Sequence, residues 1–133
     1  MLWYPTTLLG VALLFAPLAA EAEDVPDALA VEWQGKKLCE NLHEDNYIRI
    51  MRCTMPPGAV HIRHSHPVEF IYALSTGKAK VENANGTIEV PIVGDQFSIA
   101  PPIPWHEVTN IGDATLRFLI VEKKYESGDA ATK

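Results

Sequence analysis

The sequence predicts an all-β domain whose strands form a sandwich or barrel. From residue 36 onward, short runs of β-branched or alternating residues are separated by turn residues at intervals of about 8 to 12 positions. No segment keeps a helical period for more than two turns. The chain of 133 residues is long enough for one such domain and too short for two.

Nine runs fit strands in this pattern. They are residues 36–42, 47–55, 59–66, 69–74, 78–83, 87–93, 96–100, 106–110 and 115–123. The strongest turn prediction is Asn85-Gly86, because a two-residue type I′ hairpin needs positive φ at both central positions. We expect residues 36–125 to form the barrel and residues 126–133 to form a flexible tail.

The first residues resemble a targeting segment. Residues 8–20 are almost entirely apolar, and Ala20-Glu21-Ala22 follows as a small-x-small cleavage pattern. The apolar run is shorter than the roughly 20 residues that span a bilayer as a helix. We therefore expect residues 1–22 to be a signal peptide rather than a permanent membrane span, and the protein to be periplasmic or secreted. Residues 23–35 are acidic, carry Pro26 and predict an N-terminal arm.

Composition narrows the class of partner. The chain is 47% apolar and 21% charged, as in a packed globular domain. Its net charge of −6 would repel a polyanion, so we expect no nucleic-acid partner.

Two cysteines, Cys39 and Cys53, leave two alternatives open. In an oxidising compartment they could form a disulfide. A tight hairpin centred near Glu44-Asp45 would instead place Cys39 opposite Ile50, too far from Cys53 to bridge. Two buried free thiols are then expected.

Strand parity indicates a site in the middle of the chain. In residues 59–66, Val60, Ile62, His64 and His66 share one face, which we take as the buried one. His61 then points outward to solvent. Two imidazoles about 6 to 7 Å apart along one strand suit two ligands of a single metal ion.

Two later residues could complete this site. Glu69 leads the next strand after a short turn through Pro67, and His106 follows the proline-rich turn at 101–104. Three neutral imidazoles and one carboxylate leave one or two positions for water or substrate, as in catalytic metal sites. The sequence thus predicts one divalent metal ion (Zn, Mn, Cu or Fe) on His64, His66, Glu69 and His106.

Other polar and aromatic residues allow two readings each. Arg49 and Arg52 fall on opposite faces of one strand, so either could point inward toward an anionic ligand. Three aromatic side chains could line a cavity or pack in the core, namely Trp33, Tyr72 and Phe97.

The same residues carry a resemblance to a known family. The order Gly58, His64-Ser65-His66, Glu69 and Gly77 resembles the first motif of the cupin superfamily, and Gly94-Asp95, Pro101, His106 and Asn110 resemble the second. The gap from His66 to Glu69 is one residue shorter than the motif usually has. The resemblance, to a small single-domain cupin, implies an antiparallel jelly-roll β-barrel that binds metal through three histidines and a glutamate.

The expected function follows from the resemblance and the site together. We expect an exported metal-binding protein, acting as a metal-dependent dioxygenase, decarboxylase or lyase on a small organic acid or similar metabolite. The alternative is a non-catalytic barrel that binds a metal or a small molecule. The resemblance also implies a possible homodimer that forms through edge strands.

Overall fold

The computed structural model describes residues 24–124, which form nine strands and no helix. The strands are β1 (Cys39–Glu44), β2 (Ile48–Met55), β3 (Val60–His66), β4 (Glu69–Ala73), β5 (Gly77–Asn83), β6 (Gly86–Ile92), β7 (Phe97–Ala100), β8 (Ile103–Asn110) and β9 (Leu116–Lys123). Each predicted run overlaps one of these strands, although β1 begins three residues later and β8 three residues earlier than predicted. The predicted signal peptide and the predicted tail lie outside the described residues.

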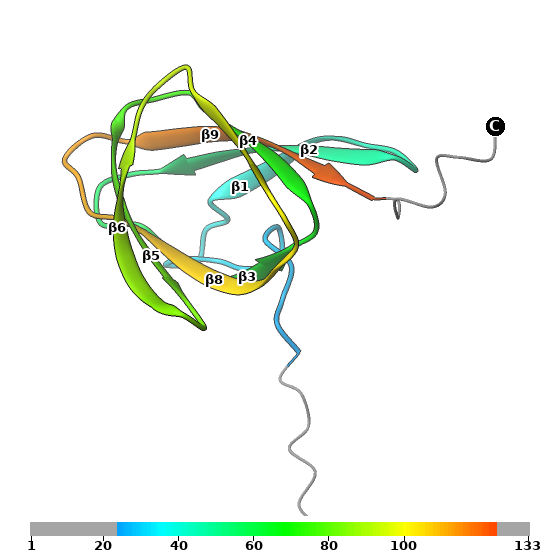
Figure 1. Cartoon of the computed structure of the whole chain (residues 1–133), viewed down its shortest axis with the longest axis horizontal. Coiled ribbons are helices and arrows are strands. Elements are labelled where there is room, and N and C mark those ends of the chain that lie inside the picture. Colours follow the sequence, from blue (N-terminus) through cyan, green and yellow to red (C-terminus); the bar gives the residue numbers. More distant parts are fainter. Residues whose placement is uncertain (1–23, 125–133) are drawn as a thin grey trace, which may run out of the picture.

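The strands form two antiparallel sheets that face each other around a common interior (Figure 1). The five-stranded sheet has the order β1-β2-β9-β4-β7, and the four-stranded sheet has the order β3-β8-β5-β6. Consecutive strands cross between the sheets, for example from β3 to β4, as in a jelly roll. The all-β fold predicted from strand spacing and motif resemblance is confirmed.

The core lies between the sheets in two connected groups of buried side chains. One group is Ala28, Cys39, Met51, Cys53 and Ile120, and the other is Leu38, Met55, Ala59, Ala79 and Leu116. Met51, Cys53 and Met55 occupy alternate positions of β2, which point to one face of a sheet. Ala28 belongs to the segment before β1, so the N-terminal arm contributes to the core.

The hairpin between β5 and β6 shows how a local side chain shifts a turn. Asn83 pairs with Gly86, so the turn residues are Ala84 and Asn85 rather than the predicted Asn85 and Gly86. The side chain of Asn83 accepts a hydrogen bond from the Asn85 backbone N–H at 2.9 Å. This Asx turn fixes the turn one residue earlier, and Gly86 takes the positive φ of 122° at the start of β6.

The cysteines form a disulfide between β1 and β2, with the two sulfur atoms 2.02 Å apart. The sequence argument against bridging was wrong for two reasons. Glu44 pairs with Arg49, so the turn is centred later than Glu44-Asp45, and a bulge between Asn41 and His43 shifts the register again. Together these changes place Cys39 directly opposite Cys53.

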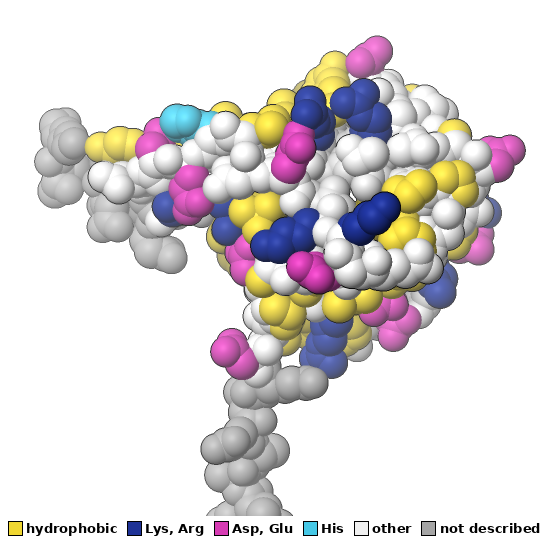
Figure 2. Space-filling view, turned by 180° about the vertical axis from the view of Figure 1, so that it is seen from behind, with side chains coloured by type: hydrophobic (Ala, Val, Ile, Leu, Met, Phe, Trp, Pro, Cys, Tyr) yellow, Lys and Arg dark blue, Asp and Glu magenta, His cyan; other side chains and the backbone are white. Residues whose placement is uncertain are grey.

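No helix that could cross a bilayer is present between residues 24 and 124. On the face opposite that of Figure 1, Lys and Arg side chains are interspersed with Asp and Glu (Figure 2). That face carries no continuous basic patch of the kind that binds a nucleic-acid backbone.

Candidate metal centre

The three histidines of the predicted site lie on neighbouring strands of the four-stranded sheet. His64 and His66 are on β3, and His106 is on β8 directly opposite His64. His64 and His66 are buried, and His106 is partly buried. The side chains project into the interior between the sheets, where water has limited access.

A bulge in β3 brings a fourth histidine inward. His61 pairs with Val108 and His64 pairs with His106, so three steps along β3 match two steps along β8. The extra residue reverses the parity, and His61, His64 and His66 are all buried while Ile62 is exposed. The predictions that His61 points to solvent and that Ile62 shares the buried face were wrong for this reason.

The three predicted imidazoles converge. Their ring centroids are separated by 4.8 Å (His64–His66), 4.5 Å (His64–His106) and 5.1 Å (His66–His106). Nε2 of His64 and Nε2 of His106 are 2.9 Å apart. Two nitrogens that each bind one ion at about 2.0–2.1 Å are roughly 3 Å apart, so this spacing fits a shared metal ion.

Hydrogen bonds fix which nitrogen of two rings is free for a metal. His64 donates from Nδ1 to the carbonyl oxygen of Ile62 at 2.6 Å, because a carbonyl only accepts. Nδ1 of His66 lies 2.6 Å from Oε1 of Glu122 and donates to this carboxylate in the same way. With Nδ1 as the donor, Nε2 is the nitrogen that can offer a lone pair, which is the form of the ring that a metal ion requires.

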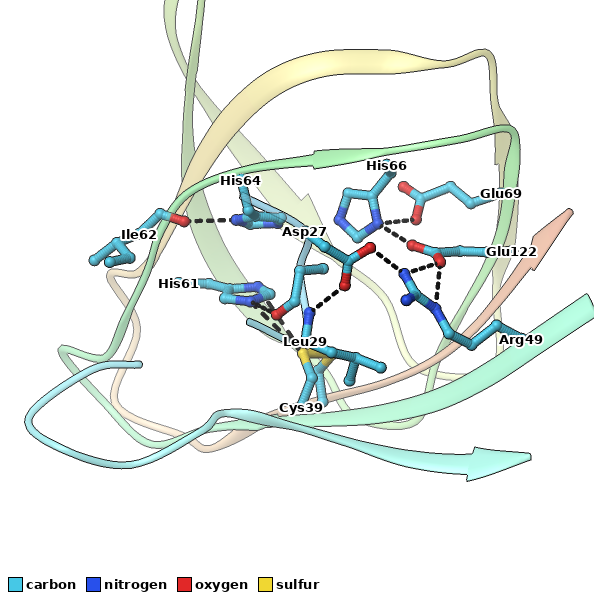
Figure 3. Close-up of a disulfide and its surroundings, with 12 residues drawn as sticks. Asp27, Leu29, Cys39, Arg49, His61, Ile62, His64, His66, Glu69 and Glu122 are labelled. Carbon is cyan, nitrogen blue, oxygen red and sulfur yellow. Dashed lines mark hydrogen bonds and ion pairs between the residues drawn. A yellow bond between two sulfur atoms is a disulfide. The ribbon is translucent and has the colours of Figure 1, made fainter. Parts of the chain in front are cut away.

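Glu69 lies on the other side of His66. It is on β4 in the five-stranded sheet, with Oε2 at 3.0 Å from Nδ1 of His66. Oε2 is buried and makes no hydrogen bond. With His66 and Glu122, Glu69 forms a second buried group of metal-binding residue types (Figure 3). Its role as the fourth ligand stays a prediction, and a buried carboxylate oxygen without a hydrogen bond fits a cation or a proton.

Burial keeps the histidines neutral. Desolvation is the main cause that lowers the pKa of His64 to about 2, of His106 to about 3 and of His61 to about 4. Desolvation also raises the pKa of the Glu69 carboxyl to about 7. Because His64 and His106 are unprotonated at neutral pH, protons do not compete with a metal ion for these two imidazoles.

The site opens into a cavity of about 410 Å³. Apolar side chains of both sheets line most of it, including Ile71, Val81, Val90, Phe97 and Phe118. Of the three aromatic candidates, Phe97 contributes to this lining. No Lys or Arg is among the described residues around the cavity, so the cationic group available to an anionic ligand would be a bound metal ion.

Sequence reasoning missed Glu122 and Asp27 behind the histidines, and it left open which of Arg49 and Arg52 faces the interior. Arg49 turns inward and contacts Glu122 and Asp27, whereas Arg52 turns outward and pairs with Glu40. Glu122 had a readable signal, because it shares strand parity with the buried Ile120. For Arg49, the two faces of its strand could not be ranked without the neighbouring strands.

Comparisons with known proteins agree with this architecture. Residues 51–122 match the family described as the cupin domain. Among solved structures, a cupin domain from Bordetella pertussis Tohama I aligns with a TM-score of 0.62 at 19% identity, over 65% of this chain and 92% of that chain. A protein with a double-stranded β-helix domain from Klebsiella pneumoniae aligns with a TM-score of 0.58 at 20% identity, over 77% and 91% of the two chains. No curated protein matches the chain.

Proposed function

This chain belongs to the cupin family, and we propose that it binds one divalent metal ion through His64, His66 and His106, with Glu69 as a fourth ligand. One observation carries the proposal, namely the convergence of three imidazoles whose ligand nitrogens lie within 4.8 Å of one another. A solvated or structural histidine has no need of two others at this distance. The proposed ion is Zn, Mn, Cu or Fe, the metals that imidazole and carboxylate ligands accept.

The cavity indicates the class of ligand. Its walls are mainly apolar, with polar side chains at the histidines and Glu69 and at Gln96 and Ser98. A small organic acid fits such a space when its carboxylate or enol oxygen meets the metal and its apolar part meets the walls. When bound, the ion would act as a Lewis acid that polarises this oxygen, as dioxygenase, decarboxylase and lyase chemistries require.

The metal site is tested by metal content and affinity. The purified wild-type protein should hold one ion per chain, and His64→Ala or His106→Ala should weaken Zn²⁺ binding by at least about 100-fold, because each loses one of few ligands. His43→Ala is the matched control, since His43 is exposed on the β1–β2 hairpin. Stoichiometric binding of unchanged affinity in folded His64→Ala would overturn the proposal.

A second candidate is a barrel that binds its ligand without turnover. The observation that favours it is the scarcity of spare acids and bases. Among the described residues around the cavity, His61 is the one titratable group beyond the four predicted ligands. Its Nε2 already contacts the carbonyl oxygen of Ala28 at 3.0 Å. A panel of small carboxylic acids separates the two functions, since stabilisation without product under every metal would favour binding alone.

We propose export on the strength of the disulfide. A disulfide persists in an oxidising compartment and is rare in the cytosol of ordinary cells. The Cys39–Cys53 bond therefore supports the predicted signal peptide and a periplasmic or secreted location. After expression of the full-length chain, mass spectrometry should find a mature amino terminus at Glu23. An amino terminus that remains at Met1 would contradict export.

We also propose a homodimer. Phe97 and Ile99 lie on β7, the edge strand of the five-stranded sheet, and are exposed at 65% and 68% of their surface. Phe70 on the adjacent strand stacks on Phe97 with ring centroids 5.3 Å apart, which extends the apolar surface. Light scattering should give twice the chain mass for the wild type and the monomer mass for Ile99→Lys. A monomeric wild type would contradict the proposal.

A further inference from the structure

A series of polar contacts leads from the buried metal centre to the partly exposed Asp27 of the N-terminal arm. Nδ1 of His66 contacts Oε1 of Glu122 at 2.6 Å, and Oε2 of Glu122 accepts from Nε of Arg49 at 2.7 Å. Nη2 of Arg49 then donates to Oδ2 of Asp27 at 2.5 Å. Figure 3 shows the four side chains in this order. They come from β3, from the paired strands β9 and β2, and from the arm, so both sheets and the arm meet behind one ligand.

The arm is attached to the ligand strand at the same place by its backbone. Asp27 forms a parallel bridge with Ser65, which lies between His64 and His66. The Ser65 backbone N–H donates to the carbonyl oxygen of Pro26 at 2.9 Å. Nε2 of His61 contacts the carbonyl oxygen of Ala28 at 3.0 Å, and the His61 ring stacks on His64 with centroids 3.7 Å apart. Three consecutive arm residues thus contact the strand that carries two ligands.

Each side chain in this series of contacts has a defined electrostatic role. A carboxylate on Nδ1–H holds the ring in one orientation and one tautomer, and it increases the electron density at Nε2. Glu122 is only 1% exposed, so its charge needs a buried partner, and Arg49 supplies two contacts to it. Asp27 is the second anion on Arg49 and holds the guanidinium from the arm side.

We propose that Glu122, held by Arg49 and by Asp27 of the N-terminal arm, is the positioning residue for the metal ligand His66, and that the arm thereby sets the metal affinity. This inference rests on the proposed metal site. It makes residues 26–28 a part of the metal centre rather than a spacer before the barrel. Glu122 does not need to contact the ion in this role, because it acts through His66.

Charge-removing variants of similar shape test the inference. Glu122→Gln should weaken Zn²⁺ affinity by about 10- to 100-fold, the usual loss when the carboxylate behind a ligating histidine is changed. Asp27→Asn should cause a smaller loss, on the order of threefold to tenfold, because it acts through two further contacts. In the double variant the loss should equal that of Glu122→Gln alone, since both changes affect one chain of contacts.

The control is Glu40→Gln. Glu40 forms the same kind of pair with Arg52 on the outer side of the β1–β2 hairpin and should leave the affinity unchanged. Wild-type affinity in folded Glu122→Gln would overturn the positioning role, and equal affinities for Asp27→Asn and Glu40→Gln would overturn the role of the arm. Asp27 is 43% exposed, so its variant retains the fold if Glu122→Gln does not.

A metal-free measurement separates this inference from the metal site itself. In ¹⁵N NMR of the apo protein, His66 should carry its proton on Nδ1. In a Glu69→Leu background, which removes the other carboxylate near Nδ1, Glu122→Leu should shift the proton toward Nε2. If the wild type binds no metal but its His66 tautomer changes when Glu122 is replaced, the proposed function is defeated and the positioning role is kept. The same tautomer in Glu69→Leu and in Glu69→Leu/Glu122→Leu would defeat the positioning role whether or not metal binds.

Discussion

Asn110 shows how one buried side chain can hold three segments together. Its Nδ2 donates to the carbonyl oxygens of Met55 and Ala114 at 2.8 and 2.9 Å, and its Oδ1 accepts from the Gly112 backbone N–H at 3.0 Å. The residue is 1% exposed, so water cannot replace these contacts. A polar residue at this position in the second cupin motif therefore closes the turn after β8.

Asn110→Ala should lower the free energy of unfolding by about 2 to 4 kcal/mol, because it leaves buried carbonyl and N–H groups without partners. Urea titration of the apo protein measures the loss. Asn110→Asp is the matched variant, since an aspartate can still accept from Gly112 but cannot donate to Met55 or Ala114. A loss below about 0.5 kcal/mol in Asn110→Ala would contradict the structural role.

The histidines of the proposed metal site could be predicted from sequence because the pattern that marks them is local. His64 and His66 are two residues apart within one part of a strand, and His106 follows a turn marked by prolines. The residues behind the histidines have no comparable local pattern in the sequence. Glu122 and Arg49 acquire their role only when β9 and β2 align at Arg49 opposite Glu122, which is a fact about register between distant segments.

At the scale of elements, the strand assignments held and the parity argument failed at one position. Alternation holds only within an uninterrupted stretch of strand, and the bulge between His61 and His64 adds a step. Nothing in the residues 61–64 distinguishes a bulged strand from a regular one. The hairpin between β1 and β2 repeats the lesson, because its bulge brought Cys39 and Cys53 opposite each other.

The disulfide should matter most for the edge of the five-stranded sheet. It joins β1, which pairs only with β2 within this sheet, across a sequence separation of 14 residues. A loop of this length predicts that Cys39→Ala/Cys53→Ala loses about 3 kcal/mol of unfolding free energy. Guanidinium titration measures this loss, and dithiothreitol should lower the wild type to the variant without affecting the variant. Equal denaturation midpoints in oxidising buffer would contradict this expectation.

At the scale of the whole molecule, the two sheets contribute different residues to the candidate metal centre. The four-stranded sheet supplies the three histidines, while the five-stranded sheet supplies Glu69, Glu122 and Arg49 behind them. The full arrangement exists only when the sheets pack against each other. Metal binding should therefore stabilise the packed state over the unfolded chain.

The same packing predicts how the apo protein responds to acid. His61, His64 and His106 have folded-state pKa values below their ordinary value of 6.5, so the stability they contribute is present above pH 6.5 and is lost as pH falls toward 4. The contribution of Glu69 to stability depends on pH in the opposite direction. Its pKa is raised to about 7, so its contribution is present below its ordinary value of 4.5 and is lost as pH rises through 7.

Three histidines outweigh one glutamate between pH 6 and 5, where the unfolded chain binds about two more protons from these groups than the folded protein. Each such proton costs about 1.4 kcal/mol per pH unit, so acidification should destabilise the apo protein by roughly 2 to 3 kcal/mol per unit in this range. Urea titrations at several pH values in chelator measure the slope. His61→Gln should reduce the number of protons taken up on unfolding by about one, which lowers the slope by about 1.4 kcal/mol per pH unit. A wild-type stability that stays constant from pH 7 to 5 would show that the buried imidazoles accept protons without unfolding.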